Sequence, residues 1–143
     1  MSPDSSDNSP ARILIVDDHP AIREALAIRV ANTDDLRVCG EAADVQEALA
    51  LAAQEAFDLA VVDITLREGN GLDLIKRLKT HQPGLKILVW SMHSEELYAE
   101  RALRAGADGY ITKEFAIREI VAAIRDVLSG NICRCTGYVQ IRE

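Results

Sequence analysis

The sequence lacks the features of a secreted, membrane-spanning or nucleic-acid-binding protein. Three cysteines, an odd number, argue against a disulfide framework and favour a reducing compartment. No apolar run approaches the roughly 20 residues that span a bilayer. Residues 1–10 have neither the basic nor the apolar region of a signal peptide. With 16 basic and 23 acidic side chains, the net charge of −7 would repel phosphates. We therefore expect a cytoplasmic protein that binds no membrane and, through this chain, no nucleic acid.

The apolar content is sufficient for one folded domain. The chain has 143 residues, of which 48% are hydrophobic, and this is enough for a single core. Residues 1–10 contain only Met1 as an apolar side chain, so we expect a disordered leader there. The regular pattern begins at residue 11 and ends near residue 130. The sequence therefore predicts a domain over residues 11–130 and a C-terminal tail over residues 131–143, to which we assign no role.

Five short apolar runs alternate with five stretches of helical periodicity. The helical stretches repeat apolar side chains every three or four residues, as at Ile22, Leu26 and Val30. Asp44 is expected to cap one helix and Gly106 to end another. This alternation predicts a parallel sheet with helices on both faces. The predicted strands lie near residues 13–16, 36–40, 59–62, 87–90 and 110–112.

Polar residues follow four of these predicted strands. In such a sheet, ligands bind outside the carboxyl ends of the strands. Three carboxylates that meet there repel one another unless a cation lies between them, and oxygen ligands favour Mg²⁺. A hydroxyl and a lysine beside that metal suit a phosphoryl group, which a carboxylate can accept. Any one of these polar residues could simply cap a helix or lie in a loop. Because all of them fall at the same edge of the predicted sheet, together they indicate a binding site. These residues are Asp17, Asp18, Asp63, Ser91 and Lys113.

The segments ILIVDDHP, VVDI, SMH and GYITK, in this order, resemble the receiver domain of two-component response regulators. The segment ALRAGADGYITK is most similar to the NarL/FixJ subfamily. The resemblance covers about residues 11–130. It implies an α/β fold: a doubly wound, flavodoxin-like sheet of five parallel strands in the order 2-1-3-4-5, with five helices.

The resemblance also implies a reaction and a cofactor. A sensor histidine kinase is the expected partner, and its phosphohistidine would transfer a phosphoryl group to Asp63 in a Mg²⁺-dependent reaction. Asp18 would bind the metal directly and Asp17 mainly through a water. The backbone carbonyl of Thr65 would complete the protein's share of the metal ligands.

The resemblance further implies a switch. Ser91 would move to a phosphoryl oxygen, Lys113 would pair with that oxygen, and Tyr110 would follow Ser91 inward. The face of the fourth helix and fifth strand would then change and control a partner, a homodimer or, in a full-length protein, transcription. Regulators of this subfamily usually continue into a helix-turn-helix domain. A truncated receiver and a stand-alone receiver are both compatible with this sequence.

Some residues near the site depart from the common receiver pattern or are open to two interpretations. Arg67 stands where many receivers have proline, so we expect a differently shaped loop. Glu114 follows Lys113 where many receivers have proline, which removes the usual reason for a cis peptide. His19 and His93 are interpreted as solvent-facing loop residues, the alternative being metal ligands or proton shuttles.

Two other classes of function fit the sequence less well. A Mg²⁺-dependent phosphohydrolase with an aspartyl nucleophile typically has a second aspartate two residues later, where this chain has Thr65. At most slow self-dephosphorylation is therefore expected, and the chain is not predicted to be an enzyme. The second class is an interaction module that works without phosphorylation. Such a module would not need the polar residues at the strand ends, so their presence counts against it.

Overall fold

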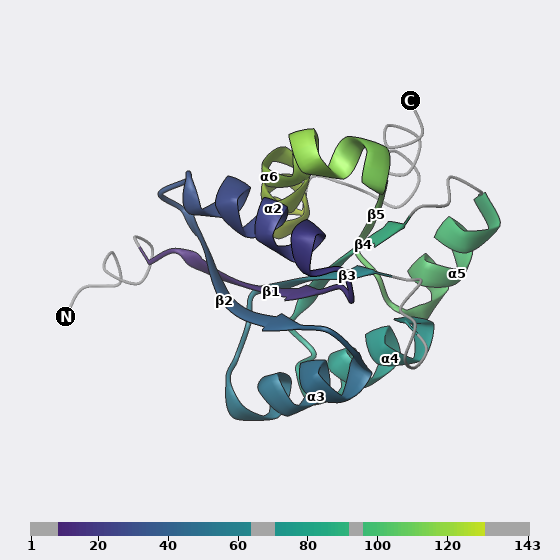
Figure 1. The fold of residues 1–143 in the computed structure, drawn as a ribbon. Helices are drawn as coiled ribbons and strands as arrows, with labels where there is room; N and C mark the ends of the chain where they lie inside the picture. Colours follow the sequence, from purple (N-terminus) through teal and green to yellow (C-terminus); the bar gives the residue numbers. More distant parts are fainter. Residues whose placement is uncertain (1–8, 64–70, 92–95, 131–143) are drawn as a thin grey trace.

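A parallel β-sheet forms the centre of the computed structural model, with helices on both faces (Figure 1). The structure describes residues 9–63, 71–91 and 96–130, without the side chains of residues 96–99 and 113–118. Five strands pair in the order β2-β1-β3-β4-β5, and every neighbouring pair is parallel. The predicted doubly wound sheet and its strand order are therefore confirmed.

The strands and helices alternate along the chain as the sequence predicts. In the described ranges, no helix is long and apolar enough to cross a bilayer. The strands are β1 (Ala11–Val16), β2 (Leu36–Ala42), β3 (Leu59–Asp63), β4 (Lys86–Ser91) and β5 (Gly109–Thr112). The helices are α2 (Pro20–Ala31), α3 (Val45–Gln54), α4 (Gly71–His81), α5 (Glu96–Ala105) and α6 (Lys113–Ser129).

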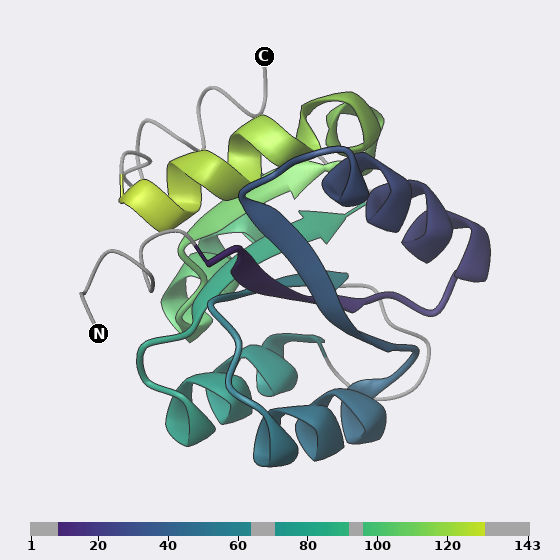
Figure 2. The ribbon, with the colours of Figure 1, turned by 90° about the vertical axis from the view of Figure 1, so that its left-hand side faces the viewer.

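The helices form two layers, one on each face of the sheet. Helices α2 and α6 pack together on one face, and α3, α4 and α5 follow one another on the opposite face (Figures 1 and 2). The apolar runs of the central strands are buried on both faces, as expected for parallel strands covered by helices. Trp90 in β4 is also completely buried and packs within the core.

Two predicted helix ends are confirmed. The Asp44 carboxylate accepts a hydrogen bond of 2.8 Å from the backbone N–H of Glu47 at the start of α3. The Glu47 carboxylate in turn accepts one of 2.7 Å from the N–H of Ala43, so both side chains bind backbone N–H groups at the start of α3. Gly106 follows α5 with a φ of 120°, a conformation that glycine adopts readily.

The pairing of β2 with β1 contains a bulge that the sequence pattern did not reveal. Ile13 is opposite Val38, whereas Leu14 is opposite Gly40, so Cys39 has no opposite residue in β1. Because Ile13 and Leu14 face opposite sides of the sheet, Val38 and Gly40 do so as well. Val38 therefore lies on the side of α2, and Gly40 on the side of α3.

A network of hydrogen bonds joins α4, β4 and β5 at the edge of the sheet where the strands begin. The Asp108 carboxylate accepts hydrogen bonds of 2.9 Å from both Lys79 Nζ and the backbone N–H of Ile87. Lys79 Nζ also donates to the carbonyl of Leu85 at 2.7 Å. The side chains of Lys79 and Asp108 are each 24% exposed. The network is thus mostly shielded from water, and it ties a helix and two strands together.

Helix α6 is also attached to the connection between α2 and β2. The Arg125 guanidinium donates two hydrogen bonds, of 2.9 and 2.8 Å, to the carboxylate of Asp35. Both side chains are about half exposed. The hydrogen bonds from Arg125 hold the pKa of Asp35 below its usual value, because they favour the charged carboxylate. This pair links α6 to the connection between α2 and β2 at the surface.

Candidate functional site

The carboxyl ends of β1 and β3 bring three carboxylates together. Asp17 follows β1, Asp63 is the last residue of the central strand β3, and both are completely buried. The side chain of Asp18 is 11% exposed. One ligand atom from each of these three residues and from His19 lies within 4.8 Å of the others. The structure thus assembles the three predicted carboxylates into one group, which we call the acidic pocket.

His19 contacts the acidic pocket, although its side chain is 48% exposed. Its Nδ1 atom lies 2.8 Å from Asp17 Oδ1 and 3.0 Å from Asp18 Oδ1. The backbone N–H of His19 donates to the same Asp17 oxygen at 2.8 Å. Pro20 begins α2 directly afterwards, with a backbone angle suited to the first helical turn. His19 is thus partly exposed, as the sequence interpretation expected, but its ring also contacts Asp17 and Asp18, which that interpretation did not include.

Two of the predicted switch residues lie on one face of β4 and β5. Ser91 pairs with Thr112, and Val89 pairs with Tyr110, so all four side chains point to the same side of the sheet. Ser91 is completely buried, and Tyr110 and Thr112 are 1% and 4% exposed. The Tyr110 ring therefore already lies inside the protein in this structure. Thr112 was not singled out in the sequence, because a single hydroxyl in an apolar strand gives no distinguishing pattern.

The hydroxyl of Thr112 is enclosed within the protein at the end of β5. Within the described part of the chain, Thr112 Oγ1 is buried and has no hydrogen-bond partner. An unsatisfied buried hydroxyl is destabilising, because it loses its hydrogen bonds to water without replacement. We therefore expect Thr112→Val, which has a similar shape and no hydroxyl, to stabilise the domain by about 1 kcal/mol. The midpoint of thermal unfolding, followed by circular dichroism, should rise by about 4 °C.

A second threonine provides a control of opposite sign. The Thr33 hydroxyl donates to the carbonyl of Val30 at 2.7 Å and accepts from the N–H of Leu36 at 3.2 Å. Thr33→Val removes these bonds and should lower the unfolding midpoint. A decrease for both variants would show that the Thr112 hydroxyl is stabilising and would contradict the prediction.

Other predicted residues fall outside the described parts of the structure. Thr65, Arg67 and His93 lie in the ranges 64–70 and 92–95. Lys113 begins α6 directly after Thr112, but its side chain is among those not described, as is that of Glu114. The metal contact of Thr65 and the phosphoryl contact of Lys113 therefore remain predictions.

The donor atoms of the acidic pocket suit a hard divalent cation. Carboxylate oxygens are the preferred ligands of Mg²⁺ and Ca²⁺. Three carboxylates at this separation also repel one another, and a bound cation relieves that repulsion. Asp17, Asp18 and Asp63 are therefore a group that could bind a metal ion.

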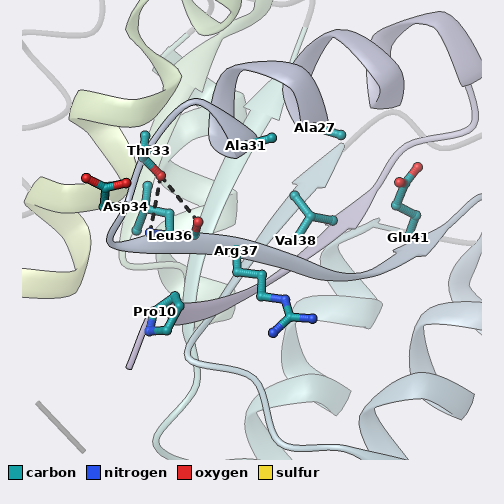
Figure 3. Close-up of a pocket in the computed structure, with 9 residues that line it drawn as sticks. All are labelled: Pro10, Ala27, Ala31, Thr33, Asp34, Leu36, Arg37, Val38 and Glu41. Carbon is teal, nitrogen blue, oxygen red and sulfur yellow. Dashed lines mark hydrogen bonds between the residues drawn. The ribbon is translucent and has the colours of Figure 1, made fainter. Parts of the chain in front are cut away.

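A hollow lies along the edge strand β2 and differs in character from the acidic pocket (Figure 3). Small apolar side chains of α2, Ala27 and Ala31, form part of its lining. Its charged side chains, Asp34, Arg37 and Glu41, are spread along its length and do not converge on one point. A ligand site usually has polar groups that converge. The acidic pocket is therefore the stronger candidate.

Comparison with known proteins agrees with this fold. Residues 13–125 match the family described as the response regulator receiver domain. The chain is 34% identical over 119 residues to the DNA-binding transcriptional activator DevR/DosR of Mycobacterium tuberculosis, covering 83% of this chain and 55% of that protein. The chain spans between 55% and 62% of the length of the curated relatives reported for it.

Two solved structures are similar to this one. A LuxR-family two-component response regulator from Aurantimonas sp. SI85-9A1 has a TM-score of 0.84 and 34% identity, covering 94% of this chain and 96% of that one. A response regulator from Burkholderia pseudomallei, solved with a phosphorylated aspartic acid, a calcium ion and citrate, has a TM-score of 0.74 and 32% identity. That match covers 83% of this chain and 69% of the other. The chain therefore belongs to the response regulator receiver domain family of two-component systems and is NarL/FixJ-like.

Proposed function

We propose that this domain accepts a phosphoryl group on Asp63 from the phosphohistidine of a sensor histidine kinase. The observation that carries the proposal is the position of Asp63, buried at the end of the central strand beside Asp17 and Asp18. An Asp63 oxygen attacks phosphorus, the bond from phosphorus to the kinase imidazole breaks, and an acyl phosphate forms. The phosphorylated aspartic acid in the Burkholderia pseudomallei relative supports this assignment.

The acidic pocket would hold Mg²⁺ for this reaction. Asp18 and Asp63 would be direct ligands, Asp17 would act mainly through a water, and the carbonyl of Thr65 would be a further ligand. A bound Mg²⁺ neutralises charge on the carboxylates and on the phosphoryl oxygens. Asp17 also fixes the turn into α2 by accepting the N–H of His19, so it orients the residues around the metal. The calcium ion in the same relative supports a divalent cation here.

Phosphorylation would alter the surface formed by α5 and β5, which are the fourth helix and fifth strand of the sequence prediction. Ser91 and Lys113 would contact the phosphoryl oxygens, and Tyr110 would respond to the displacement of Ser91. That change would control a partner, a homodimer or the output of a longer transcription regulator. The DNA-binding activator among the relatives supports a transcriptional output and hence a cytoplasmic location.

Incubation with acetyl phosphate and Mg²⁺, followed by intact mass measurement, tests the proposal. We expect one labile phosphoryl addition for each chain and no addition without a divalent cation. Continuous release of phosphate over many turnovers would instead indicate a phosphohydrolase. No addition at all would indicate an interaction module independent of phosphorylation, and either result would overturn the proposal.

A further inference from the structure

His19 places a nitrogen donor against oxygen ligands in the acidic pocket. Among the described residues that form this group, it is the one member that is not a carboxylate. Its Nδ1 atom is 2.8 Å from Asp17 Oδ1 and 3.0 Å from Asp18 Oδ1. The ring is about half exposed, so it can adjust its orientation without disturbing the apolar core. The imidazole is thus positioned to share a cation with Asp18.

The distance between His19 Nδ1 and Asp18 Oδ1 is that of neighbouring ligands around one ion. In an octahedral site with bonds of about 2.1 Å, adjacent ligand atoms are separated by about 3.0 Å. The 3.0 Å between His19 Nδ1 and Asp18 Oδ1 agrees with that separation, and Asp18 is the direct ligand of the proposed site. A metal ion can therefore take the place of a hydrogen between His19 Nδ1 and Asp18 Oδ1, with Nε2 then carrying the ring proton.

We propose that His19 coordinates the metal ion through nitrogen and thereby makes the pocket prefer Mn²⁺ and similar transition-metal ions over Mg²⁺. Imidazole suits first-row transition metals, whereas Mg²⁺ is best served by oxygen and water. The proposal rests on the metal site of the proposed function and adds to it a residue that determines which ion is bound. In the Mg²⁺ form, a water takes the position of the nitrogen.

Equilibrium binding of Mg²⁺ and Mn²⁺ to the full chain at one fixed pH tests this preference. The fluorescence of Trp90, which is buried in β4 directly opposite Asp63 in β3, provides the signal. We expect His19→Asn to weaken Mn²⁺ binding about tenfold, the lower end of losses seen when the surroundings of a metal ligand are altered. The same variant should change Mg²⁺ binding by less than about twofold.

Two further variants control for indirect effects. His81→Asn replaces an exposed histidine on α4 and should leave the binding of both ions unchanged. Asp18→Ala removes a carboxylate that serves either ion and should weaken both. Equal losses of Mg²⁺ and Mn²⁺ in His19→Asn would show that His19 only orients the carboxylates, and this would overturn the proposal.

Pulsed electron paramagnetic resonance of bound Mn²⁺ identifies the nitrogen directly. Mn²⁺ is preferable to softer ions, because the three cysteines of the chain would compete for those. In protein labelled with ¹⁵N-histidine, we expect a coupling to Mn²⁺ that persists in His81→Asn and His93→Asn and disappears in His19→Asn. A coupling that survives in His19→Asn, or that disappears in His93→Asn, would assign the nitrogen to another residue.

The outcomes separate this proposal from the proposed function. If the wild-type chain binds neither ion, the metal site itself is refuted. If it binds both ions and takes up a phosphoryl group, but His19→Asn has an unchanged preference, only the role of His19 is refuted.

Discussion

Replacing Asp63 with asparagine is expected to abolish phosphoryl uptake while leaving the domain folded. An amide has nearly the same shape as the carboxylate but cannot form an acyl phosphate. Asp63 is completely buried at the end of β3, close to two other carboxylates. Removing one negative charge reduces the repulsion in that group, so the unfolding temperature should be unchanged or higher. Intact mass after treatment with acetyl phosphate and Mg²⁺, together with thermal unfolding, measures both effects.

An exposed aspartate gives the matched control. Asp73 in α4 forms an ion pair of 2.9 Å with Arg77 at the surface, and its side chain is 49% exposed. Asp73→Asn makes the same chemical change away from the pocket and should retain the full mass shift. If the mass shift is retained in Asp63→Asn and lost in Asp73→Asn, the phosphorylated residue has been assigned incorrectly.

Replacing Asp108 with alanine is expected to cause the largest loss of stability among these variants, about 2–3 kcal/mol. The change removes the acceptor of both the Lys79 ammonium group and the Ile87 N–H. Hydrogen bonds to charged groups contribute about 1.5–3 kcal/mol each, but partial exposure of both side chains reduces that contribution. The midpoint of thermal unfolding should fall by about 10 °C. Urea denaturation provides the corresponding free energy.

The same substitution in an exposed ion pair shows how much of this loss is due to burial. Asp73→Ala breaks the surface pair with Arg77, which is four residues later in the same helix. A pair of this kind contributes no more than about 0.5 kcal/mol. If the two alanine variants lose equal stability, the Asp108 network has no special role, and the prediction fails.

The parallel sheet and its ligand edge could be predicted because they depend on local patterns, whereas the strand order came from the family resemblance. Apolar runs separated by helical periodicity define a parallel sheet, and its ligand edge is set by the direction of the strands. Asp17, Asp18 and Asp63 follow or end strands, so their meeting required no knowledge of side-chain packing. The capping role of Asp44 was equally local, since its partner is three residues away.

Features that depend on long-range register or on turn geometry could not be predicted in this way. The bulge at Cys39 leaves no trace in the alternation of β2, because the residues on either side of it are all compatible with a strand. The partners Lys79 and Asp108 are 29 residues apart in the sequence. The contact of His19 with the acidic pair depends on how the chain turns from β1 into α2, which residue type alone does not determine.

The strand order also defines a sequence of events during synthesis on the ribosome. Each strand after β1 pairs with one that has already been made: β2 and β3 with β1, β4 with β3, and β5 with β4. All three carboxylates of the acidic pocket have been synthesised once residue 63 has emerged. Helix α6 comes last, and its buried residues Ile120, Ile124 and Val127 cover one face of β4 and β5. A nascent chain without α6 leaves that apolar face open to chaperones and to aggregation until this helix docks.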